Sequence, residues 1–147
     1  MQLIATAIFL AFVGFCWSVE TNADIFSEHL KWQETLGTAR RECQTTLHVS
    51  EDAVREHGLG NRTNSEATQC FAKCIFTKLG MFNETNGFNE DSSIDRFRVA
   101  MVAKEDNIPS IREIVVKCAS KKIKTENACG WANRGFECFR KEGLSLG

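Results

Sequence analysis

Apolar residues recur at helical spacing along most of this chain, and runs that alternate in the manner of a strand are few. The pattern predicts a first helix over residues 24–41, with Phe26, Leu30 and Leu36 along its stripe. Ser50 can cap a short second helix that stops at Gly58. Ser65 caps a third helix that Gly80 ends, and its apolar side carries Ala67, Phe71, Ile75 and Leu79.

Three further helices are predicted after a stretch over residues 80–93 that is rich in Gly, Asn and Ser and is therefore expected to be a loop. The fourth helix carries Ile94, Phe97, Met101 and Val102. Asn107 caps the fifth, whose stripe is Ile111, Ile114, Val115 and Cys118. The sixth covers residues 128–140. The expected fold class is therefore all-α, with six helices and no sheet.

The first residues of the chain have the pattern of a signal peptide. Between Leu3 and Trp17 the one polar side chain is Thr6, and no charge precedes Glu20. Cys16 and Ser18 are small, which predicts cleavage after Ser18 and leaves residues 19–147 as one domain. The alternative is an uncleaved anchor, although the apolar run is close to the lower length limit for spanning a bilayer. The predicted location is therefore secreted and extracellular.

Charge and motifs exclude several classes of function. The net charge of −1 argues against nucleic acid as a partner, because nucleic-acid binding needs a concentrated basic face. The three histidines, His29, His48 and His57, have no Ser or Cys nucleophile in a recognisable motif. A secreted helical phospholipase A2 would show adjacent cysteines beside a His-Asp pair and a glycine-rich calcium loop, and both are missing. The protein is therefore predicted not to be an enzyme.

Six of the seven cysteines follow the predicted leader, and an even set in a secreted chain indicates three disulfides. Zinc and redox use are the alternatives, but no histidine is spaced as a ligand beside a cysteine and there is no C-x-x-C pair. Cys70 and Cys74 lie side by side on one helix face, so each must bond elsewhere. Spacing alone leaves about 15 pairings of six cysteines open. No cofactor and no metal is predicted.

The cysteines are separated by gaps of 26, 3, 43, 10 and 8 residues, and this order resembles the six-cysteine pattern of insect odorant-binding proteins, the pheromone-binding and general odorant-binding family. The segments KCIFTKLGMFNETNGFN and NIPSIREIVVKC also resemble the end of that family's third helix with its loop, and its fifth helix. The gap of 43 is long for the family, and the extra length is expected in the loop over residues 80–93.

The resemblance implies a compact single domain of about six helices around an apolar cavity. It also implies three disulfides, which are Cys43–Cys74, Cys70–Cys129 and Cys118–Cys138. The function it implies is a secreted carrier that binds an odorant, pheromone or similar apolar molecule and transports it through aqueous fluid. The alternative is an interaction protein on the same scaffold, acting in saliva, reproductive fluid or haemolymph. Expected partners are a small apolar ligand and, beyond it, an olfactory receptor or a second copy, without stable membrane insertion.

Candidate residues for the cavity wall are the large apolar side chains of the third to sixth helices and the loop between them. Each has a competing interpretation as plain core, because core and cavity look alike in sequence. Phe139 directly follows the sixth cysteine, a position that lines the cavity in the family. The candidates are Phe76, Phe82, Phe88, Phe97, Met101, Val102, Ile111, Val115, Trp131 and Phe139.

Two further features of the sequence bear on modification and regulation. Asn61 and Asn83 begin glycosylation sequons in predicted loops. The segment after Cys138, FRKEGLSLG, is predicted to be too short and too polar to form a helix that fills the cavity.

Overall fold

A computed structural model of the chain describes the backbone of residues 2–59 and 65–147, and the side chains of residues 23–55 and 65–147. In these residues the structure is mostly helical. The elements in order are α1 (Gln2–Leu47), α2 (Glu51–Leu59), α3 (Glu66–Lys78), β1 (Phe82–Asn83), β2 (Gly87–Phe88), α4 (Glu90–Ala100), the short 3-10 helix η1 (Glu105–Asn107), α5 (Ile108–Cys118) and α6 (Ala128–Lys141).

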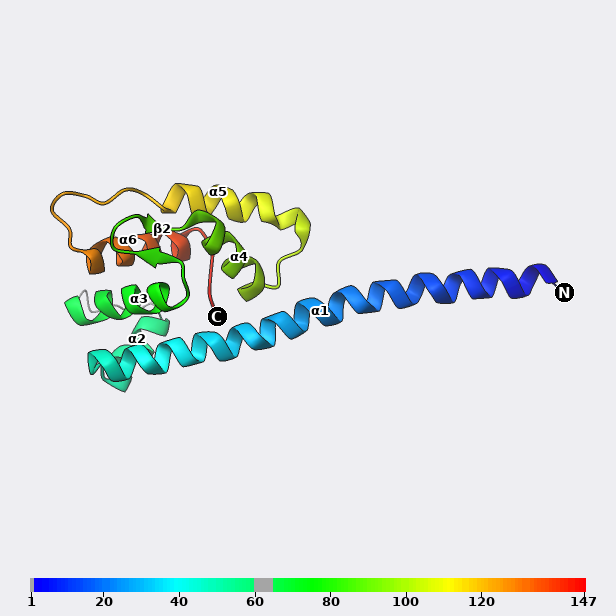
Figure 1. Ribbon diagram of the computed structural model, residues 1–147, viewed down its shortest axis with the longest axis horizontal. Helices are drawn as coiled ribbons and strands as arrows, with labels where there is room; N and C mark the ends of the chain where they lie inside the picture. The colour runs from blue at the N-terminus through cyan, green and yellow to red at the C-terminus, as the bar shows by residue number, and fades with distance from the viewer. Residues whose placement is uncertain (1, 60–64) are drawn as a thin grey trace.

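The first helix is much longer than the predicted range of residues 24–41. It begins at Gln2, runs through the predicted leader without a break and ends at Leu47. No proline interrupts this stretch, and an interior glycine such as Gly37 costs a helix only about 1 kcal/mol. His48 has a positive φ of 51° and terminates the helix. Figure 1 shows the N-terminal half of α1 projecting away from the other helices.

Polar caps fix the starts of several helices. The Ser65 hydroxyl accepts a hydrogen bond from the Thr68 amide at the start of α3, and the Ser50 hydroxyl accepts one from the Ala53 amide at α2. Both caps were predicted. Asn107 lies at the N-cap position of α5, as predicted, but its side chain makes no capping hydrogen bond and its backbone closes the 3-10 turn before the helix. The side chains of Asn89 and Asn127 cap α4 and α6.

The expectation of no sheet and of a loop over residues 80–93 is also wrong in part. This stretch contains an antiparallel hairpin that pairs Phe82 with Phe88 and Asn83 with Gly87, and α4 already begins at Glu90. Gly87 has a φ of 80° and lies against Trp131, where any Cβ would overlap the indole ring. The tight turn and this close approach are both available to glycine alone. The hairpin thereby turns two phenylalanine side chains into the core.

Three disulfides connect the helices into one body. Cys43–Cys74 joins α1 to α3, Cys70–Cys129 joins α3 to α6, and Cys118–Cys138 joins α5 to α6. These are the three pairs that the family resemblance implies. Figure 1 shows α3 between α1 and α6, with α5 on the other side of α6 and α4 between α5 and α1. Each cross-link lowers the entropy of the unfolded chain and stabilises the fold by about 2–4 kcal/mol.

Candidate ligand-binding site

The centre of the domain is a cluster of aromatic rings, here called the aromatic cluster. Phe139 of α6 lies 5.1 Å from Phe88 and 5.0 Å from Phe97, measured between ring centroids, and Phe76 lies 5.3 Å from Phe88. Most of these rings meet edge to face, which is the arrangement that aromatic quadrupoles favour. The cluster consists of Phe76, Phe82, Phe88, Phe97, Trp131 and Phe139, all buried.

A first cleft opens beside this cluster where α4, α5 and the segment after α6 meet, and it is called the α5 cleft. Its volume is about 290 Å³, close to the lower limit for small-molecule sites. Met101, Val102, Ile111, Ile114 and Leu144 provide its apolar wall. Its polar lining comes from Asn107, Ser110 and Glu142.

A second, smaller cleft of about 80 Å³ lies between α1, α3 and the C-terminal segment, and it is called the α1 cleft. Leu36, Phe76 and Phe136 form part of its wall, and Arg40 introduces a guanidinium group. Burial lowers the pKa of Arg40 because the charged form loses hydration. Its guanidinium donates a hydrogen bond to the Gly147 carbonyl at 2.8 Å, which fixes a polar donor in a wall that Arg140 and Ser145 also line.

Residues 143–147, the C-terminal segment, separate the two clefts. Leu144 lines both of them and is buried. The segment is fixed at three points, where the Leu144 amide donates to the Phe139 carbonyl at 2.8 Å, the Trp32 indole donates to the Leu146 carbonyl at 2.9 Å, and Arg40 holds Gly147. The prediction that this stretch forms no further helix agrees with the end of α6 at Lys141, but its two leucines are part of the core.

The structure separates the ten predicted cavity residues into groups. Phe76 lines the α1 cleft, and Met101, Val102 and Ile111 line the α5 cleft. Val115 of α5 is fully buried and lines neither cleft. The remaining five, which belong to the aromatic cluster, also line neither cleft: Phe82, Phe88, Phe97, Trp131 and Phe139.

The expected position of Met101 and Val102 on the fourth helix is wrong. The helix ends at Ala100, Met101 is its C-cap, and Val102 has a positive φ of 49°. Their side chains are 42% and 43% exposed, so they form the rim of the α5 cleft rather than an inner wall. Leu144 and Leu146 are further lining residues that the predicted set does not include. Their spacing of two places both leucines on one side of an extended segment, which is the signal for them in the sequence.

Other predicted features fall in different parts of the molecule. Asn83 is exposed at the end of β1, and its side-chain oxygen accepts hydrogen bonds from the amides of Thr85 and Asn86 in the hairpin turn. Asn61 lies outside the described residues. His29 donates a hydrogen bond from Nδ1 to the Val99 carbonyl at 3.1 Å and so connects α1 to α4. Across the described residues, no group of His, Cys, Asp or Glu side chains is arranged to hold a metal.

Within the part of the chain that the structure describes, no helix has the length and apolar character needed to cross a membrane.

Comparison with known proteins assigns the family. The family model described as the PBP/GOBP family matches residues 27–142. Odorant-binding protein 22 of Aedes aegypti is 34% identical over 113 residues, which cover 77% of this chain and 78% of that protein. General odorant-binding protein 99a of Drosophila melanogaster is 34% identical over 107 residues, covering 72% of each chain.

A solved structure supports the fold. Odorant-binding protein dmelOBP28a from Drosophila melanogaster superposes with a TM-score of 0.66 at 15% identity, covering 78% of this chain and 93% of that one. The helical architecture, the three disulfides and the sequence matches agree with one another. This chain belongs to the PBP/GOBP family, a family of binding proteins and not of enzymes.

Proposed function

We propose that this protein is a secreted carrier of a small hydrophobic molecule, such as an odorant or pheromone. The observation that carries the proposal is the pair of clefts on either side of Leu144, next to a core of aromatic rings. The relatives that share its family are named odorant-binding proteins, which supports the same class of ligand. The driving force for binding is removal of apolar surface from water, at roughly 25 cal/mol per Å².

The arrangement of the clefts suggests how a ligand is accommodated. Leu144 is the shared wall, and the segment that carries it is held by hydrogen bonds to α1 and to the end of α6. A change of the Leu144 side chain's rotamer would join the clefts without breaking the three disulfides. The apolar part of the ligand would contact Ile111 and Leu144, while Asn107 or Arg40 would orient a hydroxyl or carbonyl group.

Secretion is part of the same proposal. The predicted cut after Ser18 would remove the first part of α1 and leave the stretch that packs on α3 and α4. Amino-terminal sequencing of material secreted from insect cells should begin at Val19. A cell-associated product that retains Met1 would contradict secretion and with it the carrier role.

The direct test of binding is a displacement screen. The oxidised protein would be saturated with a fluorescent naphthylamine probe and titrated with volatile and long-chain apolar compounds. A carrier should bind the probe saturably with a stoichiometry of one at the clefts and release it to at least one class of compound. Absence of saturable probe binding by the folded protein would contradict the proposal.

One observation favours a second candidate, an interaction protein on the same scaffold that acts outside olfaction. The interior is filled by interlocking rings, and the clefts are small. Under this alternative the clefts bind no apolar compound, and the same screen distinguishes the two candidates.

An olfactory receptor or a second copy of the chain is the macromolecular partner we propose for the carrier.

A further inference from the structure

The turn of the hairpin between β1 and β2 carries one of the two glycosylation sequons of the sequence. Asn83 ends β1, and Glu84 and Thr85 follow it in the turn. These three side chains are exposed, and so is that of Asn86. An oligosaccharide is bulky and hydrated, so a folded protein accommodates it only where the acceptor side chain faces water. The exposure of the whole turn meets this first requirement.

The carboxamide of Asn83 has one engaged end and one free end. Its Oδ1 accepts hydrogen bonds from the amides of Thr85 at 3.0 Å and Asn86 at 2.6 Å, which is the geometry of an Asx turn. Its Nδ2 carries two hydrogens, and neither takes part in a hydrogen bond among the described residues. A sugar on Nδ2 replaces one of these free hydrogens, so the folded hairpin loses no contact.

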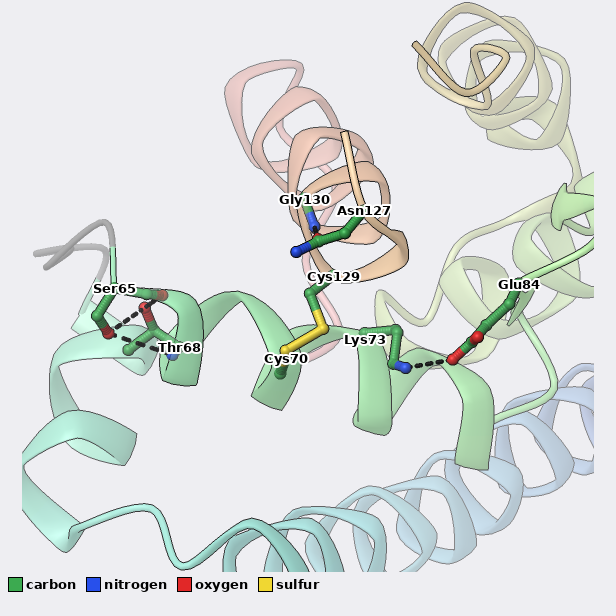
Figure 2. Close-up of a disulfide and its surroundings, with 8 residues drawn as sticks. All are labelled: Ser65, Thr68, Cys70, Lys73, Glu84, Asn127, Cys129 and Gly130. Carbon is green, nitrogen blue, oxygen red and sulfur yellow. Dashed lines mark hydrogen bonds and ion pairs between the residues drawn. A yellow bond between two sulfur atoms is a disulfide. The ribbon is translucent and has the colours of Figure 1, made fainter. Parts of the chain in front are cut away.

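The neighbours of Asn83 hold the turn in place. Phe82 packs edge to face on Trp131 of α6, with the two ring centroids 5.3 Å apart. Glu84, the middle residue of the sequon, forms an ion pair with Lys73 of α3, as Figure 2 shows. The turn is therefore anchored through the residues on either side of Asn83, and the acceptor side chain itself is not needed for these contacts.

The turn lies outside both clefts. Residues 83–86 line neither the α1 cleft nor the α5 cleft. Glu84 instead lines a groove of about 440 Å³ on the outer side of α3, which Thr77 also lines. Ile75 of the same helix lines the α1 cleft, and it is about 200° around the helix axis from Thr77 at 100° per residue. A glycan on the turn therefore starts at the outer face of α3, away from the ligand clefts.

We propose that Asn83 is an N-glycosylation site of the secreted protein. The donor is a lipid-linked oligosaccharide diphosphate in the lumen of the secretory pathway. A bond forms between Nδ2 and the anomeric carbon of the first sugar, while the bond from that carbon to the diphosphate oxygen breaks. Nδ2 loses one proton and the lipid diphosphate is the leaving group. The inference rests on the proposed secretion, because the donor is encountered only along that route.

Asn127 provides an internal comparison, because its side chain is held in a similar way. Its Oδ1 accepts a hydrogen bond from the Gly130 amide at 2.8 Å, and Figure 2 shows both residues next to Cys129. The residue two positions after Asn127 is Cys129, whose sulfur is bonded to Cys70. This site therefore lacks the hydroxyl side chain that the sequon requires at that spacing, and Asn127 should stay unmodified.

The test is peptide mass spectrometry of the protein secreted from insect cells, before and after treatment with a peptide N-glycosidase that accepts core-fucosylated glycans. The enzyme converts a glycosylated asparagine to aspartate, so each site is scored separately. The peptide with Asn83 should carry a glycan, and the peptide with Asn127 should not. A secreted protein with an unmodified Asn83 would overturn the proposal.

A second measurement separates failure of the site from failure of secretion. In this variant residues 1–18 are replaced by the leader of another secreted protein, so that the chain enters the secretory pathway whatever its own leader does. A glycan at Asn83 in this product supports the site even if the native leader does not direct secretion. An unmodified Asn83 in this product contradicts the site without bearing on the native leader.

Two substitutions at one position separate the sequon from the turn. Thr85→Ala removes the hydroxyl but keeps Asn83, the hydrogen bonds of its Oδ1 and the net charge, and this variant should be secreted without a glycan at Asn83. The matched control, Thr85→Ser, keeps a hydroxyl at the required spacing and should keep the glycan. Equal occupancy of Asn83 in the two variants would refute its role as a sequon.

The place of the turn also predicts how the glycan affects ligand binding. The glycosylated parent and Thr85→Ala should bind the fluorescent probe with dissociation constants within about twofold of each other, because the turn lines neither cleft. A marked change of probe affinity on loss of the glycan would mean that the sugar reaches a cleft. That result would contradict its position at the outer face of α3.

Discussion

Replacing Phe139 by alanine separates a core role from a pocket role at the position where the two were hardest to distinguish. The ring is 1% exposed and packs against three other rings, with centroids 5.0 Å from Phe97, 5.1 Å from Phe88 and 6.3 Å from Phe76. Truncation therefore removes a buried side chain and leaves a cavity among rings that are held in place by the disulfides. Such a change costs about 3–5 kcal/mol.

The assay is thermal unfolding of the oxidised protein, with probe binding measured on the same sample below the transition. At about 3 °C per kcal/mol for a domain of this size, the midpoint should fall by about 9–15 °C. The matched control is Phe136→Ala, which removes a half-buried ring of the same helix that lines the α1 cleft and should cost less stability. A change of about 2 °C in the unfolding midpoint corresponds to less than 1 kcal/mol of stability. If the midpoint of Phe139→Ala stays within about 2 °C of the parent while probe affinity is lost, the interpretation of Phe139 as a core residue is refuted.

Three further predictions follow from the disulfides, the cleft wall and the loop before α6. Alkylation without reduction should label none of the six cysteines after the leader, and mass spectrometry would expose any free pair. Leu144→Trp should fill the space between the clefts and weaken probe binding about tenfold or more, whereas Leu144→Ala should admit bulkier ligands, as competition titrations would show. Arg134 hydrogen-bonds the Glu126 carboxylate and lowers its pKa below 4.5, so the stability from this pair is present above pH 4.5 and is lost as the pH falls through the folded-state pKa. Below pH 4.5 the unfolding midpoint should therefore decrease more steeply for the parent than for Glu126→Gln, and parallel curves would contradict the assignment.

The sequence was sufficient for the elements whose ends carry a local signal. α3 begins after Ser65 because a serine hydroxyl satisfies an amide of the first turn, and α5 follows its apolar stripe from Ile111 to Cys118. The three disulfide pairs could be stated because the whole chain resembles a family, whereas spacing alone left them open. Helix geometry alone predicts that Cys70 and Cys74 bond away from each other, since their side chains run parallel on α3.

Other features depend on tertiary contacts that local patterns do not encode. The hairpin has two residues in each strand, too few for an alternating pattern, and its position is fixed by Trp131 packing on Gly87. The fourth helix was extended too far because Met101 and Val102 continue its apolar spacing, although the chain turns at Val102. The C-terminal segment appeared polar, yet Leu144 and Leu146 are buried because Trp32 and Arg40 hold its backbone carbonyls.

The aromatic candidates show the limit of sequence reasoning about a cavity. Rings that line a pocket and rings that fill a core have the same spacing and the same composition. The structure assigns Phe88, Phe97 and Trp131 to the packed cluster, and it assigns Met101 and Val102 to an exposed rim.

The central claim is that an apolar molecule binds beside Leu144, and intermolecular nuclear Overhauser effects between a bound ligand and the labelled protein test it most directly. The compound should be the tightest competitor from the probe-displacement screen, held at saturation. The account predicts cross-peaks from the ligand to the methyl groups of Ile111 and Leu144, with a matching loss in Leu144→Trp. Saturable binding with contacts elsewhere, or no contact with either methyl group, would contradict it.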